Sequence, residues 1–224
     1  MTGNIAHELR TPVTSILGYL EIMLENDLPN DKKLYYLQRA YKQSKNLSEL
    51  ITNVGLLSKI EHSEASNIRE KVKLNAVIAE VLQDLEKQVA EKHIRMDNRI
   101  AAACVKGNEM LLYAIFRNLL ENAVRYAGEG QTVVIKPYNT TNDRLYISFA
   151  NTSNAQLSDA QIAQLFDRFY RVSEGRTRLS GGSGLGLSIV KNAVEWHGGS
   201  IVARRLEGGG LEFIFDFECA PYEE

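Results

Sequence analysis

Apolar residues in the first quarter of the chain recur at helical spacing. Over about the first 26 positions the intervals are three and four, which predicts an amphipathic helix. Pro12 lies inside this pattern, where it removes one backbone donor and predicts a kink. A turn at 27–31 precedes a second helix over 31–60, whose small and apolar positions form a heptad seam. The seam consists of Leu37, Ala40, Ser44, Leu47, Ile51, Val54 and Ser58.

Two amphipathic helices joined by a short turn form an antiparallel hairpin, and one copy alone leaves an apolar stripe uncovered. A second copy covers that stripe, so the pattern predicts a dimeric four-helix bundle formed by residues 1–61. The run at 61–70 is polar and breaks the heptad, which predicts a domain boundary with a linker at 62–67.

Short apolar runs alternate with helical periodicity over 68–219, which predicts a mixed α/β domain followed by a tail at 220–224. The expected fold class is α+β, a helical hairpin followed by an α/β sandwich. We expect one helix that Asn75 caps and that runs to about Lys92, and another from Asn108 to about Ala127. His197 ends a third helix before two glycines, so we expect it to be structural. This third helix is predicted at 184–197 and a short helix at about 158–166. Strands are predicted at 94–100, 103–106, 131–137, 144–150, 199–205 and 211–217.

Composition excludes several classes of protein. The 224 residues carry 26 Lys and Arg against 28 Asp and Glu, a net charge of −2, which argues against binding nucleic acid by bulk electrostatics. Two cysteines without a CxxC motif exclude a disulfide scaffold and a structural zinc finger. No apolar run is long enough to cross a membrane, and no secretory leader is recognisable.

His7 lies on the face of the first helix that points away from the apolar stripe, about 200° from Ile5. Taken alone, an exposed histidine is most simply a solvated surface residue. The sharper interpretation is an imidazole that is accessible to a docking partner, because Thr11 and other small residues follow His7 on the same face and leave room there. Glu8 could accept the Nδ1 proton and leave Nε2 as a nucleophile.

Asn118 and Asn122 are one helical turn apart and project from one face of the predicted helix. With Arg125 nearby, they suit a Mg²⁺–phosphate site, because Mg²⁺ takes a few protein oxygens and keeps its other positions for water and phosphate. Asparagine is also common on solvated helix faces, so this spacing alone is a weak signal.

The run Gly182-Ser183-Gly184-Leu185-Gly186 precedes a helix, where backbone N–H groups can approach a phosphate. Its spacing differs from the dinucleotide-binding GxGxxG motif, and the chain has no Gly-Lys dipeptide, which disfavours a Rossmann site and a Walker A loop. Taken alone, this run has a second interpretation that stays open, namely an ordinary glycine-rich turn.

Four segments together resemble the conserved boxes of two-component sensor histidine kinases, in order and over nearly the whole chain. HELRTPVTSI at 7–16 resembles the phosphoacceptor box, and NLLENAVRY at 118–126 resembles the N box. FDRFYR at 166–171 resembles the F box, and GSGLGL at 182–187 resembles the second glycine box of the ATPase domain.

The resemblance implies roles for individual residues. His7 would be phosphorylated on its imidazole, with Glu8 as base or orienter, and Glu8 and Thr11 would position water in a phosphatase reaction. ATP and Mg²⁺ would be bound by the α/β domain, with Asn122 as the Mg²⁺ ligand and Asn118 as its neighbour. The remaining nucleotide contacts would be Arg125, Tyr126, Arg171, Gly182, Gly184, Leu185 and Gly186, and residues 172–183 would form an ATP lid in which Arg176 and Arg178 are candidates by charge.

One box departs from the family pattern. Where the family has Asp-x-Gly-x-Gly at the adenine site, this chain has Asn151-Thr152-Ser153-Asn154, without a glycine. We expect Asn151 to take the adenine contact, with Thr152 as the alternative. An asparagine carbonyl can accept a hydrogen bond from the adenine amino group, but it lacks the charge of an aspartate.

The implied function is ATP-dependent autophosphorylation of His7 and transfer to a response-regulator aspartate. The partners would be a second copy of the chain and a receiver domain, with no nucleic acid. The chain would be the cytoplasmic portion of a protein that reaches the inner membrane only through N-terminal segments outside it. Two alternatives stay open: an ATPase clamp that phosphorylates nothing, and a degenerate kinase that acts as a dimeric scaffold.

Overall fold

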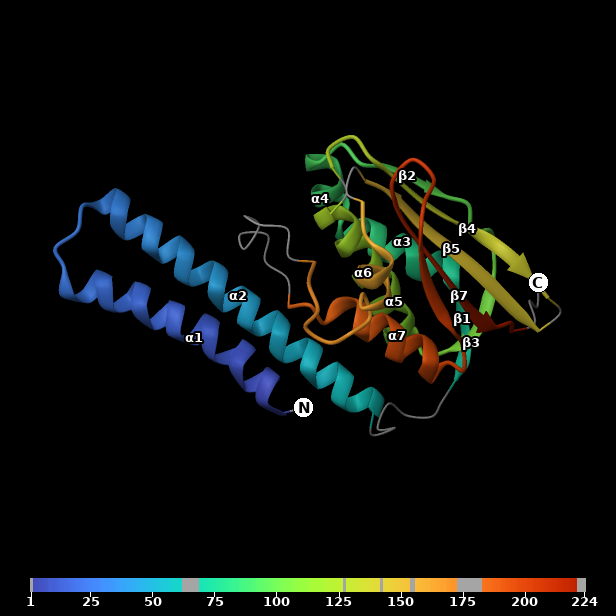
Figure 1. Ribbon diagram of the computed structural model, residues 1–224, viewed down its shortest axis with the longest axis horizontal. Coiled ribbons are helices and arrows are strands. Elements are labelled where there is room, and N and C mark those ends of the chain that lie inside the picture. Colours follow the sequence, from blue (N-terminus) through green and yellow to red (C-terminus); the bar gives the residue numbers. More distant parts are fainter. Residues whose placement is uncertain are drawn as a thin grey trace.

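The computed structural model describes residues 2–61, 69–126, 128–141, 143–153, 156–172 and 183–220. A long helical hairpin lies beside a mixed α/β part, and the helices of that part lie between the hairpin and the sheet (Figure 1). The linker predicted at 62–67 and most of the predicted lid fall outside the described residues.

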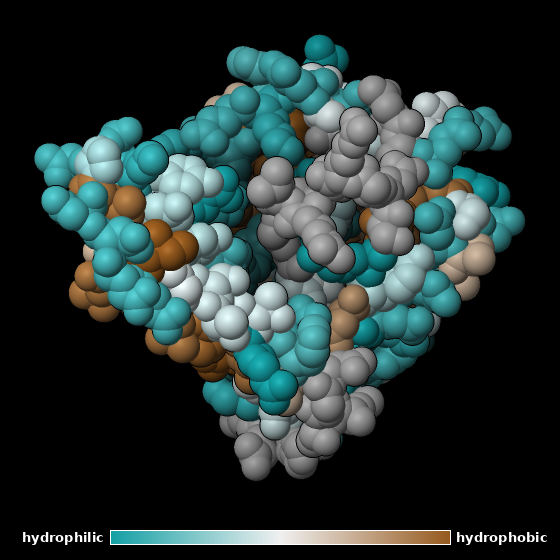
Figure 2. All heavy atoms as spheres, turned by 60° about the vertical axis from the view of Figure 1, so that its left-hand side comes forward, coloured by the Kyte–Doolittle hydropathy of each residue, from teal (hydrophilic) through white to brown (hydrophobic). Residues whose placement is uncertain are grey.

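The hairpin consists of α1 (Thr2–Glu25) and α2 (Asn30–Glu61), as the periodicity predicted. Pro12 lies within α1 and is buried. Much of the apolar seam is left exposed, including Leu37 and Ile51. Figure 2 shows hydrophobic side chains gathered on the hairpin side of the molecule. The exposed large apolar residues of the hairpin are Val13, Leu17, Leu20, Ile22, Leu24, Leu34, Tyr35, Leu37, Tyr41 and Ile51.

A five-stranded sheet in the order β2–β4–β5–β7–β6 forms the centre of the α/β part. β2 pairs with β4 in parallel, and the other pairs are antiparallel. The strands are β2 (Arg95–Asn98), β4 (Thr132–Thr140), β5 (Arg144–Thr152), β6 (Ile201–Arg205) and β7 (Gly210–Glu218). A separate antiparallel pair joins β1 (Glu70–Lys73) and β3 (Cys104–Gly107).

One face of the sheet is covered by helices, because alternate strand residues are apolar. Phe213, Phe215 and Phe217 of β7 are fully buried in this core, whereas the carboxylates of Glu212 and Asp216 on the other face pair with arginines. The helices are α3 (Leu74–Asp84), α4 (Glu86–Glu91), α5 (Glu109–Tyr126), α6 (Asp159–Ala163) and α7 (Gly186–Trp196).

The single helix predicted from Asn75 to Lys92 is wrong in two respects. The helix begins at Leu74, and the residue before it, Lys73, forms no side-chain cap. It then ends at Asp84, and α4 begins two residues later. Leu85 between them is buried with non-helical backbone angles, so tertiary packing overrides the local periodicity at this point.

The hairpin packs on the α/β part through the C-terminal half of α2. Leu57 forms a small apolar cluster with Ala114 of α5 and Ile189 of α7. An ion pair between Glu61 and Arg168 lies at the end of the same contact. Ala220, predicted to begin the tail, is buried and donates its N–H to the carbonyl of Cys104. Within the described ranges, no helix has the length and apolar character needed to cross a bilayer.

Candidate functional site

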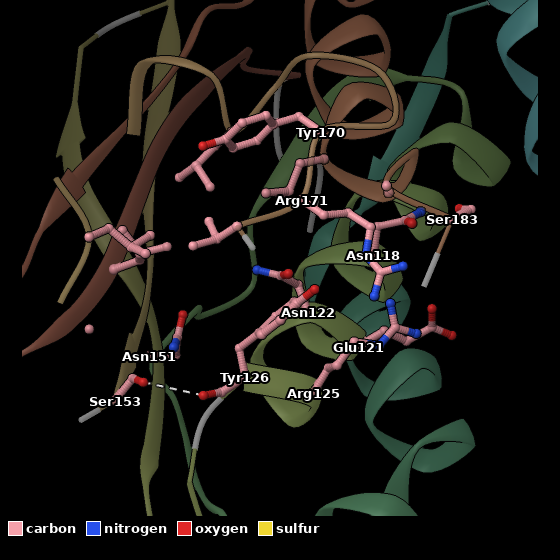
Figure 3. A pocket seen from close by; sticks show the side chains of 18 of the residues that line it. Asn118, Glu121, Asn122, Arg125, Tyr126, Asn151, Ser153, Tyr170, Arg171 and Ser183 are labelled. Atoms are coloured by element: carbon pink, nitrogen blue, oxygen red, sulfur yellow. Dashed lines mark hydrogen bonds between the residues drawn. The ribbon is translucent and has the colours of Figure 1, made fainter. Parts of the chain in front are cut away.

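A cavity of about 200 Å³ opens between the end of the sheet, α5, the start of α7 and α2. Figure 3 shows Asn151 and Ser153 on the strand side of this pocket and Asn122, Arg125 and Tyr126 on the helix side. The structure brings together residues from four separate sequence boxes. The predicted site residues that line it are Asn118, Asn122, Arg125, Tyr126, Asn151, Arg171, Gly184 and Gly186.

One asparagine of α5, Asn118, lies directly against the glycine loop. Asn118 donates from Nδ2 to the carbonyl of Ala114 at 2.7 Å, which fixes its amide. A Cβ added to Gly186 would lie 2.8 Å from Asn118 Oδ1. Only a glycine allows the start of α7 to approach α5 this closely. Asn122, one turn further along α5, lines the same pocket.

The C-terminal end of α5 is held by groups from outside the helix. The Lys92 ammonium donates to the carbonyl oxygens of Val124 and Arg125. Ser153 donates from Oγ to the carbonyl of Tyr126 at 3.2 Å, which ties the end of β5 to the end of α5. These contacts position Arg125 and Tyr126 at the rim of the pocket.

Asn151 is a buried polar residue with an unsatisfied oxygen. It lies on β5 between Val133 of β4 and Leu211 of β7, and its residue is 4% exposed. Its Oδ1 has no hydrogen-bond partner among the described residues. An unpaired buried acceptor costs about 1–3 kcal/mol, so it points to a donor that arrives with a ligand. The amino group of adenine is such a donor.

Thr152, the alternative adenine contact, is not part of the pocket lining. Its hydroxyl accepts from the backbone N–H of Thr132 at 2.9 Å and donates to Gln131 Oε1 at 2.6 Å. Neighbouring side chains on a strand point to opposite faces, and Asn151 takes the pocket side. The geometry therefore favours Asn151 over Thr152 for the adenine contact.

The F-box segment and the glycine loop are joined by their backbones. Phe169 has a φ of 64°, rare for a non-glycine residue, and its N–H donates to the carbonyl of Gly184 at 2.9 Å. Gly184 has a φ of 69°, and a Cβ there would lie 2.8 Å from Phe169 Cα. This crossing places Tyr170 and Arg171 at the pocket wall (Figure 3).

Leu185 does not line the pocket, unlike the glycines on either side of it. Its side chain is buried in the apolar cluster with Leu57 and Ile189. It therefore anchors the glycine loop by packing. Gly182, Arg176 and Arg178 lie outside the described residues.

The sequence analysis missed several pocket residues, among them the polar side chains of Glu49 and Asn53 on α2 and of Glu121 on α5. Glu121 accepts from Arg117 Nε at 2.9 Å. Glu49 and Asn53 reach the pocket only because α2 packs against α7, a long-range contact for which the sequence contains no local signal.

His7 is not among the residues that line the pocket. Its side chain is 76% exposed, and Nδ1 lies 3.9 Å from Glu8 Oε1, beyond a direct hydrogen bond. Thr11 donates from Oγ1 to the carbonyl of His7 at 3.2 Å. The imidazole is accessible, as predicted, and in this arrangement it is separate from the pocket.

His197 is structural, as predicted. It is buried, with Nε2 accepting from the N–H of Asn108 at 3.0 Å and Nδ1 lying 2.6 Å from the carbonyl of Ala193. Burial lowers its pKa from 6.5 to about 4, because the charged form is desolvated. The neutral imidazole therefore joins α7 to the start of α5.

The residues present fit a nucleotide with Mg²⁺. Asparagine oxygens, an arginine and glycine backbones surround the pocket, and α7 presents its positive N-terminal end there. In the part of the chain that the structure describes, no group of three His, Cys, Asp or Glu side chains forms a metal cage. Mg²⁺ does not need one, since it uses few protein ligands together with phosphate.

Comparisons with known proteins agree on both parts of the chain. The model of the histidine kinase-, DNA gyrase B- and HSP90-like ATPase family matches residues 107–221. The model of the His Kinase A (phospho-acceptor) domain matches residues 1–63. The sensor histidine kinase RppB of Synechocystis sp. is 31% identical over 215 residues, 95% of this chain and 47% of RppB.

Solved structures share the fold. The histidine kinase AdeS of Acinetobacter baumannii superposes with a TM-score of 0.78 at 20% identity, over 96% of this chain and 98% of AdeS. The histidine kinase ThkA, in its complex with the response regulator protein TrrA, gives a TM-score of 0.73 at 24% identity, over 98% of this chain and 61% of that one. The chain spans about half the length of the first curated relatives it matches.

Proposed function

The chain belongs to the two-component sensor histidine kinases, and on that premise we propose that it phosphorylates its own His7 from ATP. The phosphoryl group would then pass to an aspartate of a response-regulator receiver domain. The observation that carries the proposal is the pocket itself, in which four separate sequence boxes converge around an unpaired buried acceptor.

At the pocket, the proposed roles follow the chemistry of each side chain. Asn151 faces the adenine, and Arg125, Tyr126 and Arg171 contact the rest of the nucleotide. Asn122 is the Mg²⁺ ligand and Asn118 holds the glycine loop beside it. Bound Mg²⁺ supplies charge neutralisation at the phosphates. The backbone at Gly182, Gly184 and Gly186 offers N–H groups to the phosphate oxygens.

At His7, the proposed step is an in-line displacement on the γ-phosphorus. The lone pair of Nε2 forms the N–P bond while the bond from phosphorus to the β,γ-bridging oxygen breaks, and ADP leaves with that electron pair. Glu8 takes the Nδ1 proton as charge develops on the ring. The reaction depends on positioning, and His7 lies outside the pocket, so the two parts must change their relative placement, or a second protomer must supply the histidine.

Two partners are proposed. The exposed apolar residues of α1 and α2 support a homodimer through residues 1–61. The complex of ThkA with TrrA supports a response regulator as the second partner. We also propose that Glu8, which is partly exposed, and Thr11, which is exposed, position water when the phosphorylated regulator is dephosphorylated.

One experiment separates this proposal from its alternatives. The chain is incubated with γ-labelled ATP and Mg²⁺, and the label is challenged with acid and with base. A label that is lost in acid and kept in base supports a histidine kinase. ATP hydrolysis without a label supports the ATPase clamp, and no nucleotide binding supports the scaffold. The match to a phosphoacceptor domain favours the kinase over the clamp.

A further inference from the structure

We propose that the nucleotide pocket accepts 6-oxopurine triphosphates as well as ATP, because an unanchored amide, that of Asn151, recognises position 6 of the purine. The inference rests on the proposed nucleotide site and extends it to the class of purine that the site takes. It is carried by the surroundings of one side chain.

The Asn151 amide is buried and nothing in the described part of the chain holds it in one orientation. The residue is 4% exposed and lines the pocket. Among the described residues, Oδ1 has no hydrogen-bond partner and Nδ2 donates to none. By contrast, the Asn118 amide is fixed by its bond to Ala114. Turning the Asn151 amide by half a turn therefore breaks no hydrogen bond.

An amide and a carboxylate differ in what they can offer a base. An ionised carboxylate only accepts, so it favours the 6-amino group of adenine and repels the 6-oxo group of hypoxanthine or guanine. An amide accepts through oxygen and donates through nitrogen. In one orientation Asn151 accepts from an amino group, and in the other it donates to a carbonyl. Both purines therefore find a neutral partner at residue 151.

The other side chains at the strand side of the pocket do not restore the preference for a 6-amino over a 6-oxo purine that a carboxylate would give. Ser153 donates its hydroxyl proton to the Tyr126 carbonyl, and as a neutral group it does not repel an oxo group as a carboxylate does. The carboxylates among the described lining residues are Glu49 and Glu121, which belong to α2 and α5. Figure 3 shows Glu121 beside Arg125 and across the pocket from Asn151. The lining also includes the apolar side chains of Leu157, Leu165, Leu187 and Leu211.

Calorimetry on the whole chain tests this inference by measuring the binding of ATP and of inosine triphosphate, each with Mg²⁺. The two nucleotides differ at the 6-position of the base and in protonation of the neighbouring ring nitrogen, and neither has a 2-amino group. We expect their dissociation constants for the unmodified chain to agree within about tenfold. Asn151→Asp should raise the ratio of the inosine to the adenine constant by at least about tenfold, since a buried carboxylate facing an oxo group is left unpaired.

Asn122→Ala is the matched control, because this asparagine is assigned to the Mg²⁺–phosphate end. It should weaken both nucleotides and leave their ratio unchanged. Strong preference for ATP in the unmodified chain overturns the inference and leaves the kinase proposal standing. An unchanged ratio in a folded Asn151→Asp variant overturns the assignment to this residue. Binding of neither nucleotide to the folded chain overturns the inference and the proposed function together.

Discussion

Gly186 lies so close to Asn118 that a Cβ on the glycine would be 2.8 Å from Asn118 Oδ1. This single approach joins the N box on α5 to the glycine box at the start of α7. It sets the width of the pocket where the phosphates of the nucleotide are proposed to lie.

Gly186→Ala should weaken ATP binding by about tenfold or more, because the new methyl group must displace the Asn118 amide. Stability should change little, since alanine is a better helix former than glycine. Calorimetry of MgATP binding measures the first effect and denaturant unfolding the second. Gly18→Ala and Gly55→Ala are matched controls, because a Cβ at either helical position meets nothing within 4 Å. Equal binding in Gly186→Ala and the controls would contradict this role.

Folding stability should fall between pH 6.5 and pH 4 through His197. Its folded pKa of about 4 lies below the unfolded value of 6.5, so the unfolded chain binds the proton first as pH falls. The contribution is complete above pH 6.5 and lost progressively towards pH 4, by about 3 kcal/mol. Urea unfolding at several pH values measures it. Glutamine cannot ionise, so the free energy of unfolding of His197→Gln should lack this dependence on pH. The same dependence in both proteins would mean that another group causes the loss of stability.

Breaking the contact between Glu61 and Arg168 should speed autophosphorylation. The ion pair holds the hairpin against the α/β part in an arrangement where His7 is outside the pocket. A partly exposed pair contributes up to about 1 kcal/mol, so Glu61→Gln should raise the initial rate by no more than about fivefold. Lys87→Gln removes one partner of an exposed pair on α4 and is the control. A slower rate in Glu61→Gln would mean that this docked arrangement is the reactive one.

A charge on the hairpin seam should separate the dimer. Ile51 is 57% exposed in one copy, and Ile51→Glu places a carboxylate in the proposed interface, where an unpaired charge is costly. Val202 of β6 is 56% exposed on the sheet, so Val202→Glu is a control of equal exposure. Sedimentation should find the first variant monomeric and the second dimeric. If both variants are dimeric, the dimer interface lies elsewhere than at Ile51.

The sequence predicted elements well where the hydrophobic period was long, and it failed where tertiary packing decided. The hairpin and α5 appear where periodicity placed them. The break at Leu85 was not predictable, because a buried side chain interrupts a continuous helical pattern. Asn151 was separated from Thr152 only once the strand register was known. Glu49 entered the pocket through a contact between distant helices, which no local pattern encodes.

The most direct test of the account is the position of the phosphoryl group. The chain is labelled from γ-labelled ATP with Mg²⁺ in three forms: unmodified, His7→Ala and His93→Ala. His93 is the matched control, since its side chain is 73% exposed against 76% for His7. The account predicts an acid-labile, base-stable label that is absent only in His7→Ala. A label that persists in His7→Ala would contradict the central claim.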